Sequence, residues 1–201
     1  MNAEDPKQDK LTLMMLSAID SGPGISQRRL AGHMGVALGL ANSYIKRCVK
    51  KGFIKINEAP ANRYLYYLTP KGFKEKSRLT ARFLSSSLNF YRSAAESCER
   101  VFVNCAMDGV SHIILCGDSE LAEIAFLKSL ESGISVDGLF DPSGERSRFF
   151  SQTVWHDINN LPSASCVITA LAGVDSLKKD LEKNRSDIVY VPDILDLKNV
   201  S

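Results

Sequence analysis

Residues 38–51 place short side chains ahead of cations along one face of an expected helix. Helical spacing assigns five apolar residues to the buried face: Leu38, Ala41, Tyr44, Ile45 and Cys48. The opposite face then carries Gly39, Asn42, Ser43, Lys46, Arg47 and Lys50. Short side chains allow close approach to base edges, Asn can pair bidentately with adenine, and cations can hold phosphates. This pattern predicts a helix that reads double-stranded DNA.

The flanking segments predict how that helix is held. A helix over 10–20 is followed by the breaker 22–24, and Ser26 is a suitable N-cap for a short helix over 27–34. Beyond the DNA-reading helix, strands over 53–56 and 63–68 enclose a polar tip. Three helices followed by a hairpin indicate a winged helix-turn-helix. Four further DNA contacts are expected from Gln27, Arg28, Arg29 and Arg63.

A long helix is expected to begin at Thr69-Pro70 and to run to about Cys105. It carries apolar residues at alternating spacings of four and three, namely Leu84, Leu88, Tyr91, Ala95, Cys98, Phe102 and Cys105. Such a seam favours a homodimer, which would present two DNA-reading helices to two half-sites. The alternative is packing against the chain's own domains. The predicted divisions are a DNA-binding domain over 1–68, a connecting and dimerisation helix over 69–108, and a ligand-sensing domain over 109–201.

Two stretches of the first half resemble the winged helix-turn-helix of MarR-type regulators. They are "SQRRLAGHMGVALGLANSYIKRCVKKGFI" and "YLYYLTPKGFKEKSRLTARFL", and the likeness covers about residues 10–90. Within that family, the group associated with exopolysaccharide gene clusters is the most similar. Ala37 departs from the family pattern, which often has a Ser cap there. The resemblance implies a dimeric transcriptional regulator and points to polysaccharide biosynthesis genes.

The second half alternates strands and helices. Strands are expected over 112–116, 136–140, 165–169 and 188–191, with a short one at Val154, and helices are expected to end at Gly133 and Lys183. This order predicts an α/β domain with a small parallel sheet of Rossmann-like type.

The loop after the first of these strands could bind a ligand. Gly117, Asp118, Ser119 and Glu120 open the next helix, and Asp141 ends the following strand. The segments "IILCGDSELAEIA" and "VDGLFDP" resemble Rossmann-like domains of sugar-modifying acyltransferases and nucleotide-sugar binders. The resemblance implies phosphate at the helix start and ribose at the acid, and Thr169 completes the predicted ligand-binding set.

Three ligand hypotheses stay open for this loop. In the dinucleotide pattern Ser119 stands where the second glycine belongs, and Asp118 and Glu120 add negative charge beside the phosphate site. The departures weigh against an NADH-responsive redox sensor. A nucleotide or nucleotide-sugar effector is preferred, and a domain used only for protein contacts is the other alternative.

The charge distribution separates the two halves. Residues 1–108 hold 17 Lys and Arg against 9 Asp and Glu, whereas residues 109–201 hold 8 against 14. The basic half therefore suits a polyanion. His33, His112 and His156 lie in separate segments, and the five cysteines lack metal-ligand spacing. The sequence accordingly predicts a cytoplasmic protein that is not an enzyme, has no metal and does not bind a membrane.

Overall fold

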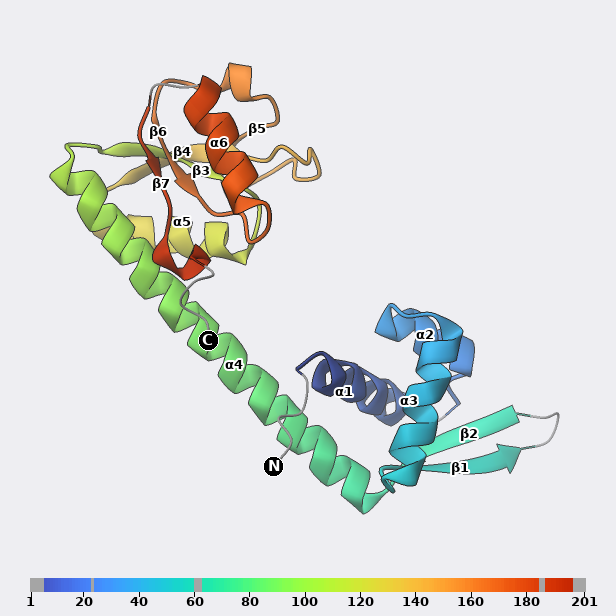
Figure 1. Ribbon diagram of the computed structural model, residues 1–201. Coiled ribbons are helices and arrows are strands. Elements are labelled where there is room, and N and C mark those ends of the chain that lie inside the picture. Colours follow the sequence, from blue (N-terminus) through green and yellow to red (C-terminus); the bar gives the residue numbers. More distant parts are fainter. Residues whose placement is uncertain (1–5, 23, 60–62, 185–186, 197–201) are drawn as a thin grey trace. The chain divides into compact units, whose positions relative to one another are not determined.

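The computed structural model describes residues 6–22, 24–59, 63–184 and 187–196 and divides the chain into two compact units. They comprise residues 1–87 and 88–201, so the boundary falls inside the long helix α4 (Pro70–Met107). The elements of each unit are labelled in Figure 1.

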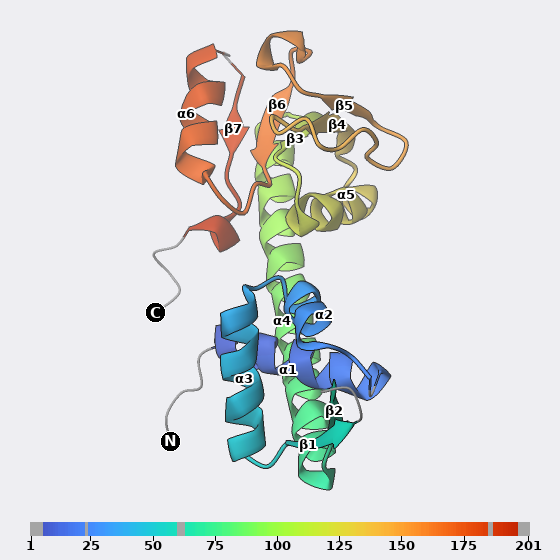
Figure 2. The same cartoon turned by 90° about the vertical axis from the view of Figure 1, so that its right-hand side faces the viewer.

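The first unit is a winged helix-turn-helix, as predicted. It contains α1 (Pro6–Ser21), α2 (Gln27–Met34) and α3 (Leu38–Lys50), and then β1 (Ile54–Ala59) and β2 (Arg63–Leu68). The two strands pair antiparallel (Figure 2), and a core that includes Met15, Leu16, Leu30, Ile45 and Tyr66 joins them to the helices. Helix α1 begins four residues earlier than the sequence predicted.

Local signals explain the ends of the helices. The Ser26 hydroxyl accepts a hydrogen bond from the Arg29 amide at 3.3 Å, and Gly35 ends α2 with φ +62°. Ala37 makes no side-chain cap on α3. Thr69 accepts from the Gly72 amide at 3.0 Å and donates to the Gly52 carbonyl at 2.6 Å, which fixes the start of α4 against the hairpin.

The predicted dimerisation seam on α4 is divided between two environments. Its later members, Ala95, Cys98, Phe102 and Cys105, are buried in the core of the second unit. They therefore pack against the chain's own sheet, which corrects their assignment to a dimer interface. The earlier members, Leu84, Leu88 and Tyr91, are 54%, 55% and 44% exposed.

The second unit is the predicted α/β domain with a parallel sheet. Its strands are β3 (His112–Cys116), β4 (Ser135–Phe140), β5 (Thr153–Trp155), β6 (Ser165–Ile168) and β7 (Val189–Tyr190), in the spatial order β5-β4-β3-β6-β7. The helices are α5 (Glu120–Ser132) and α6 (Val174–Asn184), with 3₁₀ turns at Ile158–Asn160 and Asp193–Leu195.

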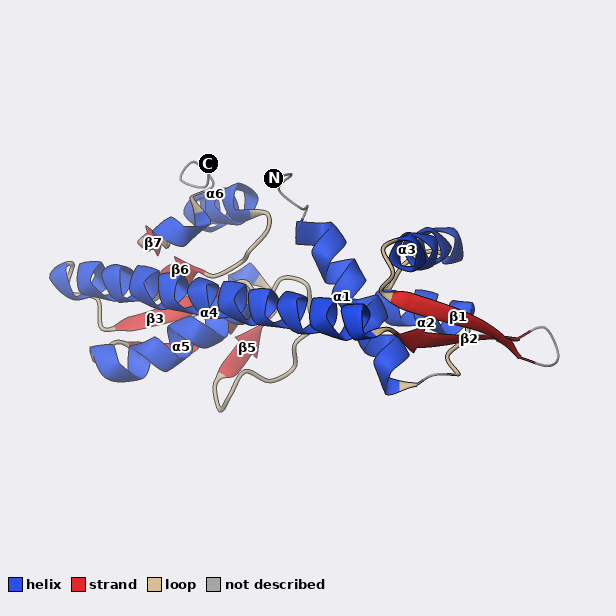
Figure 3. Cartoon of the chain, turned by 90° about the horizontal axis from the view of Figure 1, so that it is seen from below, coloured by secondary structure: helices blue, strands red, loops and turns tan. Residues whose placement is uncertain are grey.

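Helices cover both faces of this sheet, with α6 on one side and α5 on the other (Figure 3). Side chains of β3 alternate accordingly. Ile113 and Leu115 pack with α4 and α5, whereas Ile114 and Cys116 pack with α6. Strand order changes direction at β3 and β6, so the loops after these two strands flank a topological switch point, where α/β sheets bind ligands.

Candidate functional site

The exposed face of α3 presents cations that no described carboxylate neutralises. Lys46, Arg47 and Lys50 are exposed, and none of them forms an ion pair with a described residue. Gly39 and Ser43 are also exposed, and the Ser43 hydroxyl donates to the Gly39 carbonyl at 3.1 Å. Unpaired cations beyond short residues are what a DNA-reading helix requires.

Asn42 differs from its expected environment. The residue is half-buried, and its side-chain oxygen is buried without a hydrogen-bond partner among the described residues. Burying an amide oxygen without a hydrogen bond costs free energy. Rotation of the Asn42 side chain towards an external hydrogen-bond donor would therefore be favourable.

Two leucines at the start of α3 are exposed, and neither was among the DNA contacts that the sequence predicted. Leu38, which was expected in the core, is 47% exposed, and Leu40 is 45% exposed. Both residues lie in the first turn of α3, where the helical period overestimates burial. Apolar side chains at this position can contact thymine methyl groups.

Helix α2 contributes two exposed cations and a hydrogen bond to the hairpin. Arg28 and Arg29 are exposed, whereas the Gln27 amide donates to the Tyr66 hydroxyl at 2.9 Å. Because Tyr66 is buried in β2, Gln27 fixes the hairpin to α2. The predicted contact at Arg63 falls on a side chain outside the described part of the structure.

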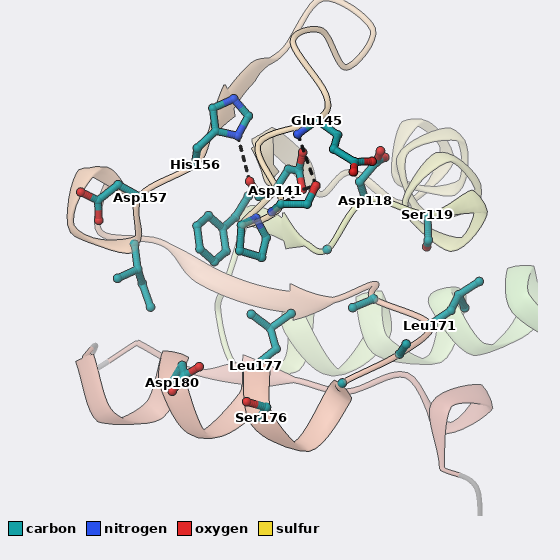
Figure 4. Close-up of a pocket in the computed structure, with 18 of the residues that line it drawn as sticks. Asp118, Ser119, Asp141, Glu145, His156, Asp157, Leu171, Ser176, Leu177 and Asp180 are labelled. Carbon is teal, nitrogen blue, oxygen red and sulfur yellow. Dashed lines mark hydrogen bonds between the residues drawn. The ribbon is translucent and has the colours of Figure 1, made fainter.

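A cavity of about 900 Å³ lies at the carboxyl ends of β3, β4, β5 and β6 (Figure 4). Of the predicted ligand residues, Gly117, Asp118, Ser119, Glu120 and Asp141 line it. Thr169 does not, because it is fully buried behind the loop. The sequence missed the opposite wall, which is formed by the loops after β5 and β6 and by α6.

Hydrogen bonds close the crevice between the loops that follow β3 and β6. Thr169 Oγ1 donates to the Gly117 carbonyl at 2.6 Å, and Ser119 Oγ donates to the Thr169 carbonyl at 2.5 Å. Ser119 Oγ also accepts from the Leu121 amide at 3.0 Å and so caps α5. The place that phosphate takes in dinucleotide-binding folds therefore holds the Ser119 hydroxyl instead.

Asp141 organises the loop after β4. Its carboxylate accepts hydrogen bonds from the Ser143 amide, the Ser143 hydroxyl and the Arg146 amide at 3.0, 2.6 and 2.9 Å. Burial opposes ionisation of Asp141, but these donors hold its pKa below the ordinary value. Both oxygens are thus already engaged by protein before any ribose arrives.

Arg146 is committed to neighbouring acids. Its guanidinium lies 2.5 Å from Asp118 and 2.9 Å from Glu123, and hydrogen bonds to these two carboxylates raise the pKa of Arg146. The pairing draws the loop after β4 towards the start of α5. The Arg146 guanidinium is therefore already paired with two carboxylates.

Six carboxylates are among the twenty residues that line the cavity, and no Lys or Arg is among them. Figure 4 shows acids from the loops after β3, β4 and β5 and from α6. The acidic set is Asp118, Glu120, Asp141, Glu145, Asp157 and Asp180.

The histidines do not gather into one centre. His156 Nδ1 lies 2.8 Å from the Asp141 carbonyl, and His112 pairs with Asp137 at 2.9 Å. Within the described residues, no three His, Cys, Asp or Glu side chains form a group suited to a metal ion. All five cysteines are buried thiols, and burial raises the pKa of Cys98 to about 12. No described helix is long and apolar enough to cross a membrane.

Solved structures similar to the chain fall into two groups. The PcaV transcriptional regulator from Streptomyces coelicolor, solved with its natural ligand, is 23% identical over 39% of this chain and 57% of its own, with a TM-score of 0.37. The O-methyltransferase NcsB1 from neocarzinostatin biosynthesis is 13% identical over 92% of this chain and 77% of its own, with a TM-score of 0.38. Human N-acetylserotonin methyltransferase in complex with SAM is 13% identical over 81% and 65%, with a TM-score of 0.33.

These structures correct one expectation. The sequence predicted that the chain is not an enzyme, but two similar structures that cover 81% and 92% of it are methyltransferases. The expected link to exopolysaccharide clusters gains no support from the structures described above.

No curated protein matches the chain significantly. The sequence model of a family described as winged helix-turn-helix DNA-binding matches residues 8–55, which include α2 and α3. The match agrees with the helix order and with the exposed cations of α3. The chain therefore carries a winged helix-turn-helix DNA-binding domain.

Proposed function

We propose that the protein is a dimeric transcriptional regulator whose α/β unit senses a small molecule. The observation that carries the proposal is the row of unpaired cations on α3, inside a winged helix-turn-helix. Cations left without partners on a structured surface favour a polyanionic ligand, because phosphates then replace water rather than an existing ion pair.

Different residues of α2 and α3 would contact the bases and the phosphates of DNA. Leu38, Gly39, Leu40 and Ser43 would meet base edges in the major groove, with Asn42 behind them. Phosphates on either side would be held by Lys46, Arg47, Lys50, Arg28 and Arg29. Because no side chain caps α3, its first amides are also available to a phosphate.

Selection from a random duplex library, followed by fluorescence anisotropy on the selected site, tests this proposal. The double variant Lys46→Ala/Arg47→Ala should bind at least about tenfold more weakly, and its plot of log affinity against log salt should flatten by about two units. Lys179→Ala, which removes an exposed cation from α6, is the matched control. Unchanged affinity and salt slope in the double variant would remove α3 from the DNA interface.

The dimer part of the proposal is supported by Leu84, Leu88 and Tyr91, which form the exposed section of the α4 seam. A second copy packed there would pair two DNA-reading helices. Light scattering of the unaltered protein should give twice the mass of one chain. The double variant Leu84→Glu/Leu88→Glu should give the mass of a single chain. A monomer in the unaltered protein would contradict this part.

The sensing part is supported by the cavity at the switch point of the sheet. Its acidic lining fits poorly with an NADH-responsive sensor and with a phosphorylated nucleotide or nucleotide-sugar. A unit that makes only protein contacts would show no thermal shift with any small molecule. The sequence resemblance makes the DNA upstream of polysaccharide biosynthesis genes the first to test for binding.

A further inference from the structure

We infer that the cavity of the α/β unit takes an organic cation with a nucleoside-sized body and no phosphate. The inference rests on the proposed sensing function and gives its effector a chemical class. Three features of the cavity support it: the charge of its lining, the closed phosphate position and the apolar wall.

The charge of the lining sets the sign of the ligand. Glu120, Glu145 and Asp180 are exposed at the cavity, and no described residue forms an ion pair with any of them. Asp141 is held ionised by its own loop. A cavity with low-dielectric walls focuses this field, so a pyrophosphate would be repelled and a cation concentrated.

The phosphate position is closed by protein groups. Ser119 caps α5 and also bonds to the Thr169 carbonyl, so a phosphate would have to break two hydrogen bonds to reach the helix. Gly117 has φ +106°, and a Cβ there would lie 2.4 Å from that of Ala170. The loops after β3 and β6 therefore meet directly at Gly117 and Ala170.

The apolar wall gives the body of the ligand a surface to lie on. Ile158 and Leu177 are half-buried and face the cavity with Leu171, Ala170 and Pro142. Figure 4 shows Leu177 between α6 and the sheet, with Asp180 further along the same helix. A space of about 900 Å³ suits a drug-sized or nucleoside-sized molecule rather than an inorganic cation.

A matched pair of probes isolates the effect of charge. S-adenosylmethionine carries a sulfonium cation, whereas S-adenosylhomocysteine has the same nucleoside and amino acid with a neutral thioether. In calorimetric titrations of the full chain, the cation should bind at least about tenfold more tightly than the thioether. UDP-glucose and NADH should not bind.

Substitutions locate the binding. Glu120→Gln and Asp180→Asn should each weaken S-adenosylmethionine binding at least about threefold and reduce the preference over the thioether. Glu182→Gln, on α6 but outside the lining, should leave both unchanged. Melting curves of each variant confirm that it is folded.

Four results would overturn the inference: no binding of S-adenosylmethionine, equal affinities for the two adenosyl probes, binding of UDP-glucose or NADH, or no effect of the lining variants. Anisotropy with DNA, measured on the same samples, separates this failure from that of the proposed function. Loss of the cation preference with intact DNA binding would contradict only the inferred ligand class. Ligand binding without any DNA binding would contradict the proposed regulatory function instead.

Discussion

The two units of this protein hold their charges in opposite ways. On α3 of the first unit, Lys46, Arg47 and Lys50 face outward without ion pairs to described residues. In the second unit, Asp141 is bound by hydrogen bonds from its own loop, and Arg146 forms ion pairs with Asp118 and Glu123 of neighbouring segments. The cations of the first unit are available to a charged partner. In the second unit, Asp141 and Arg146 instead hold the loops beside the cavity in place.

The contrast shows why the two sites differ in how readily they can be recognised. A cationic surface needs only the right residue types on one helical face. A cavity depends on which loops meet, which groups neutralise one another and which acids remain.

Gly117→Ala should disrupt the second unit most. The residue has φ +106°, and the added Cβ would lie 2.4–2.6 Å from Ala170, so the loops after β3 and β6 would have to part. We expect a loss of about 3 kcal/mol or more in the free energy of unfolding, measured by urea denaturation. Gly32→Ala, where nothing lies within 4 Å, is the control and should not destabilise. Equal stability of both variants would show that the loops do not meet as described.

Ser119→Ala should be the next largest change. It removes the cap on Leu121 and the bond to the Thr169 carbonyl, which together contribute about 2 kcal/mol to stability. Chemical denaturation measures the loss. Ser176→Ala, in the exposed wall of the same cavity, should cost less than about 0.5 kcal/mol. A neutral effect of Ser119→Ala would contradict the closed crevice.

Leu38→Ala and Leu40→Ala should weaken binding to the selected DNA site about tenfold each if they contact thymine methyls. Replacing the contacted thymines by uracil should produce a similar loss in the unaltered protein and little further loss in the variants. Anisotropy on the matched duplexes measures both. Additive losses from the two changes would show that these leucines do not touch the methyl groups.

The smallest effect concerns acid pH. Because the folded-state pKa of Asp141 is lowered, its contribution to stability is present above the pKa of the unfolded chain, near 4, and is lost as pH falls through the folded value. Asp141→Asn should therefore flatten the decline in melting temperature below about pH 4. Ser143→Ala, which removes one donor, should flatten it less. An unchanged acid limb would contradict the role of these hydrogen bonds.

Sequence reasoning recovered the winged helix-turn-helix, the long helix and the parallel sheet, because each rests on local periodicity and turn residues. It misjudged Leu38, since the helical period does not show where neighbouring cover ends. It also treated the α4 seam as one surface, although Ala95, Cys98, Phe102 and Cys105 pack on the chain's own sheet. An apolar stripe on a helix indicates that this face is buried, but it does not show whether the chain itself or a second copy covers it.

The sequence by itself determined the exposed cations of α3, because one helix positions all of them and its period is known in advance. The ligand cavity was decided by tertiary structure alone. Its walls come from loops after four strands and from α6, and its charge depends on the pairing of Arg146 with Asp118 and Glu123. Hydrogen bonds and ion pairs between segments distant in sequence have no periodicity, so only the folded chain shows which acids remain for a ligand.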